Sequence, residues 1–101
     1  MTLRVNTQQH SVTHYQALLA ASDHSSQRSD LSPQALVLDT PCAVTSLPEF
    51  ASGAVSVQDA GAQLSAQLMD VPMDIPTNRP TGLRVLDACA APGGKTAHLL
   101  E

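Results

Sequence analysis

The chain is poor in aromatic and basic residues. The first scarcity excludes a core rich in aromatic side chains, and the second excludes a clustered basic surface for nucleic acid. Its 101 residues include no Trp, one Tyr and one Phe, so a core has to be built mainly from Ala, Val and Leu. Ala buries little surface, and such a core would be thin. Only five residues are Lys or Arg against nine Asp or Glu, and the formal net charge is −4. The basic residues are scattered along the sequence. If the protein binds nucleic acid, most of the electrostatic attraction to the phosphate backbone must therefore come from other residues than these five.

Cysteine and long apolar runs are also scarce. Cys42 and Cys89 form neither a C-x-x-C pair nor a disulfide framework. No apolar segment approaches the roughly 20 residues that span a bilayer, and the N-terminus has no signal-peptide pattern. We therefore expect a protein of the reducing cytoplasm that does not enter a membrane.

The apolar pattern predicts an α/β chain of short elements. We expect strands at Thr2–Asn6, Ala35–Leu38, Val55–Val57 and Leu83–Asp87, and helices at Val12–Ala21, from Val57 to about Met69, and at Gly94–Glu101. Ser11 is the expected cap of the first helix, whose Tyr15, Leu18 and Leu19 share a face.

The remaining segments read as connections. Apolar or small residues recur at helical spacing in the second helix, at Val57, Gly61, Leu64 and Leu68. Ser22–Pro33 is polar and Ser-rich and predicts a loop. Val71–Gly82 contains three prolines and predicts a linker.

The most informative segment runs from Val85 to Thr96 and reads V-L-D-A-C-A-A-P-G-G-K-T. A short apolar run ends in Asp87, a turn of small residues follows, and a helix begins. Small residues allow a ligand to approach the backbone closely, and ligands of open α/β sheets bind at the carboxyl ends of strands. The segment therefore predicts a strand–turn–helix cradle for a nucleotide-like ligand.

Three interpretations of this cradle are open. A phosphate-binding P-loop requires G-x-x-x-x-G-K-[ST]; Gly94-Lys95-Thr96 fits its end, but Cys89 occupies the position of the first Gly, and Pro92 stiffens the loop. A tight strand–helix turn without a ligand is the second. The third is a site for a methyl donor, and it comes from a resemblance.

The segment Leu86–Thr96 resembles the first S-adenosylmethionine motif of the RNA (cytosine-5)-methyltransferases, a strand and Asp followed by C-A-A-P-G-G-K-T. Val57-Gln58-Asp59-Ala60, with Gln63, resembles the V-Q-D helix upstream of that motif. Met1–Asn6 and Leu47-Pro48 with Phe50 are similar to the bacterial branch that methylates 16S ribosomal RNA. Of these matches, only the motif at Leu86–Thr96 is specific.

The resemblance implies a fold, a cofactor and a partner. The fold would be the start of a Rossmann-like class I methyltransferase domain (51–101), preceded by part of a small α+β RNA-recognition-like subdomain (1–50). The cofactor would be S-adenosyl-L-methionine, contacted by Cys89, Ala90, Ala91, Pro92, Gly93, Gly94 and Lys95. Asp87 would order the loop or contact the cofactor indirectly, with Gln58 and Asp59 packed beside it. The partner would be 16S ribosomal RNA, bound through regions mostly outside this chain by a monomeric protein.

The resemblance places no catalytic residue in this chain. The family attacks C6 of cytosine with a cysteine thiolate and uses a second cysteine for product release, and both follow the cofactor motif. Cys42, in L-D-T-P-C, precedes the motif and lacks the small-residue run of the family's D-A-P-C loop, so we interpret it as structural; Cys89 belongs to the cofactor loop. We expect the chain to be a fragment that is inactive alone, because a single strand cannot preorganise a cofactor site.

Other polar residues carry weaker signals. His10 and His14 have the i, i+4 spacing of zinc ligands, but no Glu completes H-E-x-x-H, and a solvated pair and no metal site are expected. His98 is expected on a helix surface, and the Gln-rich face of the second helix at solvent or between domains. Besides the methyltransferase, two function classes remain open: a nucleotide-binding P-loop-like module, and a non-enzymatic RNA-binding piece, against which the acidic balance argues.

Overall fold

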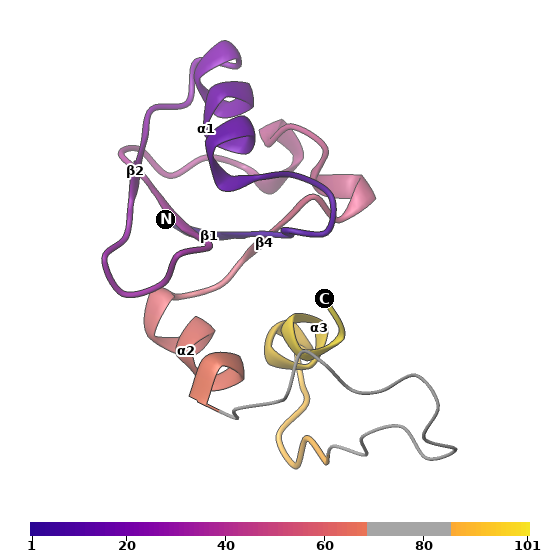
Figure 1. Ribbon diagram of the computed structural model, residues 1–101. Helices are drawn as coiled ribbons and strands as arrows, with labels where there is room; N and C mark the ends of the chain where they lie inside the picture. Colours follow the sequence, from indigo (N-terminus) through magenta and orange to yellow (C-terminus); the bar gives the residue numbers. More distant parts are fainter. Residues whose placement is uncertain (69–85) are drawn as a thin grey trace.

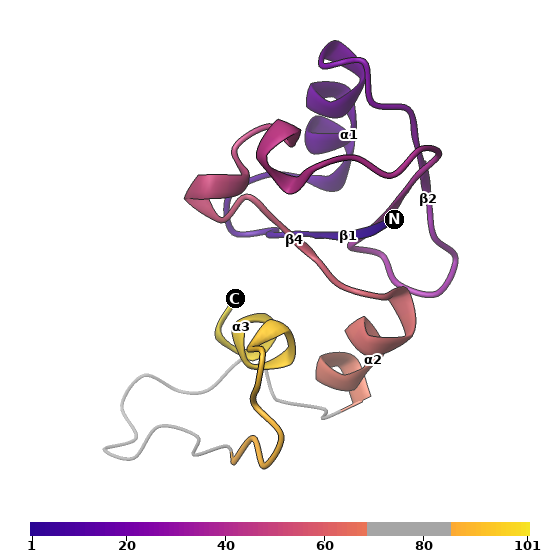
Figure 2. The ribbon, with the colours of Figure 1, turned by 180° about the vertical axis from the view of Figure 1, so that it is seen from behind.

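A computed structural model describes residues 1–68 and 86–101. Four strands form one antiparallel sheet in the order β2-β3-β1-β4, with α1 on one face and α2 and α3 on the other (Figure 1). Seen from behind, the same two layers of helix enclose the sheet (Figure 2). The elements are β1 Thr2–Val5, α1 Val12–Ala21, β2 Ser26–Arg28, β3 Ala35–Leu38, the 3-10 helices Val44–Ser46 and Phe50–Ser52, β4 Val55–Val57, α2 Ala60–Leu68 and α3 Gly94–Leu100.

The alternation along β1 decides what each face of the sheet buries. Leu3 and Val5 are fully buried in the core with Tyr15 and Leu19 of α1. Arg4, between them, points to the opposite face, because successive side chains of a strand alternate. Its side chain is only 1% exposed. One face of the sheet is therefore an apolar core and the other a buried polar layer.

Helix α1 forms where its sequence predicts, with the bounds and the cap expected. The Oγ of Ser11 accepts a hydrogen bond from the backbone N–H of His14 at 3.2 Å, which satisfies a donor that the first turn leaves free. Val12, Tyr15 and Leu19 are buried, and Leu18 packs partly against the same core. The helix ends at Ser22, whose backbone N–H donates to the carbonyls of Leu18 and Leu19.

Two of the expected elements differ from the structure. The prediction of a loop over Ser22–Pro33 was wrong at Ser26–Arg28. These residues form the edge strand β2, which pairs with Leu36 to Leu38 of β3. An edge strand has one neighbour and needs no apolar alternation, so its polar sequence gave no signal. Leu86 and Asp87 are not in a strand, since no described strand pairs with them, and Leu86 is 89% exposed. Residues 83–85 of that expected strand and the Val71–Gly82 linker lie outside the described residues.

Helix α2 forms within the predicted range but begins at Ala60, because Val57 is the last residue of β4. The residues that α2 buries are not those that predicted it. Of its apolar stripe, Val57 is 47% and Leu68 81% exposed. Gln63 is instead fully buried, and Ala60 nearly so. The expectation of a helix was thus right, while the apolar stripe does not form its packed face. The reason is the polar layer beneath the sheet, against which α2 lies.

Candidate functional site

The loop that leads into α3 is ordered by one carboxylate. The Oδ1 of Asp87 accepts a hydrogen bond from the backbone N–H of Cys89 at 3.0 Å, and Thr96 Oγ1 donates to Oδ2 at 2.6 Å. Asp87 therefore joins the start of the loop to the first turn of the helix that follows it. The Thr96 hydroxyl, followed by the Cys89 amide, holds the pKa of the Asp87 carboxyl below its usual value.

The loop ends at a glycine that its backbone requires. Gly93 has a φ of 106°, a conformation that L side chains rarely adopt, and α3 begins at the next residue. Gly94 lies against the side chain of Gln58: a Cβ at Gly94 would be 4.0 Å from Cδ of Gln58. The turn thus brings the loop backbone up to the segment that joins β4 to α2.

A hollow of about 200 Å³ lies between that loop and the β4–α2 junction. Six of the seven residues predicted for the cofactor line it: Cys89, Ala90, Ala91, Pro92, Gly94 and Lys95. Gly93 does not, because it turns the chain at the edge of the loop. The opposite wall consists of Val57, Gln58 and Ala62. The structure therefore brings the two sequence motifs, 30 residues apart, onto one hollow.

Gln58 is the buried polar group of this hollow. It is 7% exposed, and its Nε2 donates to the carbonyl of Ala62 at 3.4 Å. Within residues 1–68 and 86–101, its Oε1 has no hydrogen-bond donor, which is costly for a buried acceptor. Asp59, predicted beside it, instead uses its Oδ1 to accept from the Gly61 N–H at 2.8 Å at the start of α2.

The hollow fits part of a methyl-donor site. Small-molecule pockets measure about 300–1,000 Å³, so a hollow of this size accommodates a portion of a nucleoside-sized ligand. Its walls are backbone and small side chains on one side and a buried amide acceptor on the other. Such walls suit a ligand that carries hydrogen-bond donors.

Other candidate residues lie away from the hollow. Nε2 of His10 pairs with Glu49 at 2.7 Å, while His14 is exposed 5.0 Å away, ring centre to ring centre. In the part of the chain that the structure describes, no three metal-binding side chains cluster. Cys42 is half-buried against the core that α1 covers, and Cys89 is exposed in the loop.

One expected surface residue is buried. His98 was expected on the surface of its helix, but it is 9% exposed beneath the sheet, beside Arg4 and Glu101. Burial, followed by the charge of Arg4, lowers its pKa. Gln63 is likewise buried. The Gln-rich face of the second helix was expected at solvent or between domains, but at Gln63 it packs against the sheet. No pattern in the sequence marks either burial, because the residues that cover them are distant in the chain.

The chain is similar in sequence to ribosomal RNA methyltransferases. The family model "Methyltr_RsmF/B-like, ferredoxin-like domain" matches residues 1–45. Ribosomal RNA small subunit methyltransferase B of Pseudomonas putida is 50% identical over all 101 residues, which are 21% of that protein. The same-named proteins of Vibrio cholerae and Pasteurella multocida are 48% and 50% identical, with equal coverage.

This chain is a relative of ribosomal RNA small subunit methyltransferase B. The resemblance predicted from its motifs, to the RsmB (Sun/Fmu) type, is confirmed. The chain spans about a fifth of the length of these methyltransferase B relatives. The strand order β2-β3-β1-β4 with α1 between β1 and β2 agrees with the ferredoxin-like description of residues 1–45. Among the residues described, no helix is long and apolar enough to cross a bilayer.

Proposed function

We propose that the protein to which this chain belongs methylates cytosine at C5 in 16S ribosomal RNA, using S-adenosylmethionine. The observation that carries the proposal is the hollow between the C-A-A-P-G-G-K loop and Gln58, in a chain whose relatives are named ribosomal RNA methyltransferases. The protein would act in the cytoplasm as a monomer. Residues 1–50 would belong to an RNA-recognition-like subdomain and 51–101 to the start of a Rossmann-like methyltransferase domain.

The seven loop residues from Cys89 to Lys95 would form the cofactor contact. Asp87 holds the loop through its hydrogen bonds with Cys89 and Thr96, and Gly93 adopts the positive φ at which the loop turns into α3. When bound, S-adenosylmethionine supplies an activated methyl group. The protein's part here is to bind and orient it, which backbone groups of a loop fixed at both ends do without reorganisation.

Neither cysteine of this chain has the setting of the attacking thiolate. Cys42 packs against the core under α1, and Cys89 is exposed in the loop that would contact the cofactor. An attacking thiol needs an environment that lowers its pKa and a position facing the base rather than the methyl donor. We therefore propose that the nucleophile lies elsewhere in the protein, and that this chain alone does not transfer methyl groups.

Binding is the direct test of the cofactor assignment. Isothermal titration calorimetry of the full-length protein with S-adenosylmethionine and with S-adenosylhomocysteine should give binding that Gly94→Val weakens, because the added side chain projects toward Gln58. The matched control is Leu100→Ala on the same helix, whose side chain is 80% exposed and does not line the hollow. Equal binding by Gly94→Val and the wild type would contradict the assignment.

A phosphate-binding loop is the second candidate, because Gly94-Lys95-Thr96 matches the end of a P-loop and Lys95 lines the hollow. Titration with ATP–Mg²⁺ separates the two functions. Tight binding of ATP–Mg²⁺ without binding of S-adenosylmethionine would support the P-loop and contradict the methyltransferase. The coding sequence after Glu101 gives an independent check, since the methyltransferase predicts a D-A-P-C and a later T-C there.

A further inference from the structure

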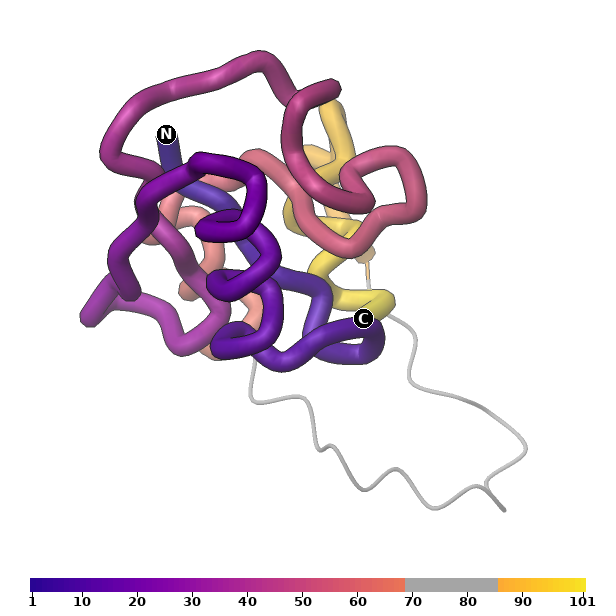
Figure 3. The backbone as a smooth tube through the Cα atoms, turned by 90° about the horizontal axis from the view of Figure 1, so that it is seen from above, coloured from indigo at the N-terminus to yellow at the C-terminus, as the bar shows by residue number. Residues whose placement is uncertain are grey.

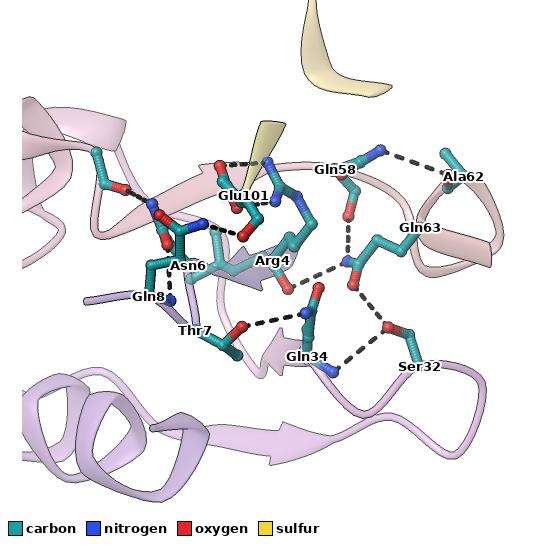
Figure 4. A network of polar contacts seen from close by, with 12 residues as sticks. Arg4, Asn6, Thr7, Gln8, Ser32, Gln34, Gln58, Ala62, Gln63 and Glu101 are labelled. Carbon is teal, nitrogen blue, oxygen red and sulfur yellow. Dashed lines mark hydrogen bonds and ion pairs between the residues drawn. The ribbon is translucent and has the colours of Figure 1, made fainter. Parts of the chain in front are cut away.

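The side chain of Gln63 joins three separate parts of the chain on the polar face of the sheet. It is fully buried, and all of its hydrogen-bonding groups are engaged (Figure 4). Its Oε1 accepts from Ser32 Oγ at 2.9 Å, in the loop between β2 and β3. Its Nε2 donates to the carbonyl of Leu3 on β1 at 3.3 Å and to the carbonyl of Gln58 at 3.0 Å.

Gln58 is thereby fixed on both sides of its backbone. Its N–H donates to the carbonyl of Thr2 at 3.2 Å, which continues the pairing of β4 with β1. Its carbonyl is held by Gln63. These two hydrogen bonds fix the backbone of Gln58 and therefore the direction in which its side chain leaves the β4–α2 junction. The carbonyl of Ala62 holds the side-chain amide in turn, and the amide faces Gly94 across the hollow. The position of the hollow's wall therefore depends on Gln63, which does not line the hollow itself.

We propose that Gln63 is a positioning residue for the cofactor hollow, holding Gln58 against the 89–95 loop and tying that loop to the sheet. The identity of the ligand in this role rests on the proposed function, whereas the hydrogen bonds of Gln63 do not depend on any ligand. An apolar side chain of similar size would fill the space but would leave the carbonyls of Leu3 and Gln58 without their donor. Gln58 would then be free to shift within its packing.

The test uses Gln63→Leu in the full-length protein with two controls. Gln67→Leu removes a weaker bond to the same Ser32 from an exposed position on α2. Leu19→Ala destabilises the core under α1, on the opposite face of the sheet. In spectra without ligand, we expect Gln63→Leu to shift the amide resonances of Gly94 and of the Gln58 side chain, and the controls to leave them in place.

The ligand readout is the dissociation constant for S-adenosylhomocysteine, measured well below the melting temperature of each variant. Because a displacement of about 1 Å costs up to about 100-fold in a preorganised site, the smaller shift expected here should weaken binding about tenfold in Gln63→Leu. Leu19→Ala, although less stable, should bind like the wild type. A purely structural role for Gln63 would instead lower stability in both variants and leave both dissociation constants unchanged.

The outcomes separate the two proposals. Unshifted Gly94 and Gln58 resonances in Gln63→Leu would overturn the positioning role, whatever binds. A wild-type full-length protein that binds neither S-adenosylmethionine nor S-adenosylhomocysteine would contradict the cofactor assignment alone. Should Gln63→Leu fail to fold, Ser32→Ala removes the bond that orients the Gln63 amide together with two longer bonds, from Gln67 and from the Gln34 N–H. It should produce the same shifts at smaller size, and Gln67→Leu controls for the bond from Gln67.

Discussion

Asp87 orders the candidate loop through two hydrogen bonds that depend on its charge. Because its pKa is lowered in the folded chain, chiefly by Thr96, the ionised form is favoured there. The two hydrogen bonds therefore hold the loop fully at pH values above the usual carboxyl pKa of about 3.9. They are lost as the pH falls below that value and through the lowered pKa of Asp87. We predict that Thr96→Val raises the pKa of Asp87 and that the loop loosens at a higher pH.

This prediction is measured by the pH titration of the Asp87 carboxyl carbon and of the Cys89 amide by NMR. Thr96→Ser is the control, since it keeps the hydroxyl that donates to Asp87. Coincident titration midpoints for the wild type and Thr96→Val would show that the hydroxyl does not hold the carboxylate.

Tyr15 is the buried polar group of the apolar core. Its hydroxyl donates to the carbonyl of Pro48 at 2.7 Å, and burial, followed by Glu49, raises its pKa to about 12. The neutral phenol is thus favoured in the folded state, and this contribution is complete below pH 10 and is lost as the pH rises toward 12. Tyr15→Phe should lower the free energy of unfolding by about 1 kcal/mol at neutral pH.

Denaturant titration measures that loss, and tyrosinate absorbance measures the pKa. Tyr15 is the only tyrosine, so the absorbance signal has one source. A phenol that titrates near 10 in the folded chain would contradict the assigned burial and hydrogen bond.

At the scale of elements, α1 gives the cleanest prediction. Ser11→Ala removes the side-chain acceptor for the His14 N–H and should cost about 1 kcal/mol of stability. Ser22→Ala, at the other end of the helix, is the matched control, because Ser22 caps through its backbone N–H. Thermal unfolding of both variants is the measurement, and equal changes in melting temperature would argue against the cap.

Elements that carry their own signal were predictable, and contacts between distant elements were not. The helix Val12–Ala21 follows from its cap and its apolar face, and the strand Ala35–Leu38 from its apolar run. The motif loop was recognisable from its residues, and six of the seven predicted positions line one hollow. The burial of Gln63 and His98 could not be predicted, because each depends on the sheet face contributed by β1, more than 50 residues away.

At the scale of the whole molecule, the polar face of the sheet is an internal surface. Arg4, Gln63 and His98 are buried on it under α2 and α3. The two aromatic residues of the chain, Tyr15 and Phe50, pack against the apolar core instead. Single-stranded RNA is bound by stacking of bases on exposed aromatic side chains, so this face offers no such platform. In the described residues, this face of the sheet packs against α2 and α3 and presents no base-stacking surface.

An ion pair attaches the end of α3 to the sheet, in addition to the burial of His98. The C-terminal end of α3 lies beside the turn after β1 (Figure 3), where the Arg4 guanidinium pairs with the Glu101 carboxylate and Gln8 donates to the Glu101 carbonyl. Arg4 is buried, so loss of its partner would strand a desolvated charge, at a cost of about 3–5 kcal/mol. A helix of seven residues can detach locally at a smaller free energy than global unfolding.

We therefore predict that Glu101→Gln releases α3 without unfolding the sheet. Hydrogen exchange of the α3 amides should accelerate by about 100-fold, while the amides of Leu3 and Val5 keep their protection. The double variant Arg4→Met/Glu101→Gln should exchange more slowly than Glu101→Gln, because it removes the buried charge together with its partner. Glu49→Gln is the control, since its pair with His10 is half exposed and contributes little. An α3 that stays protected in Glu101→Gln would show that the pair does not hold this helix in place.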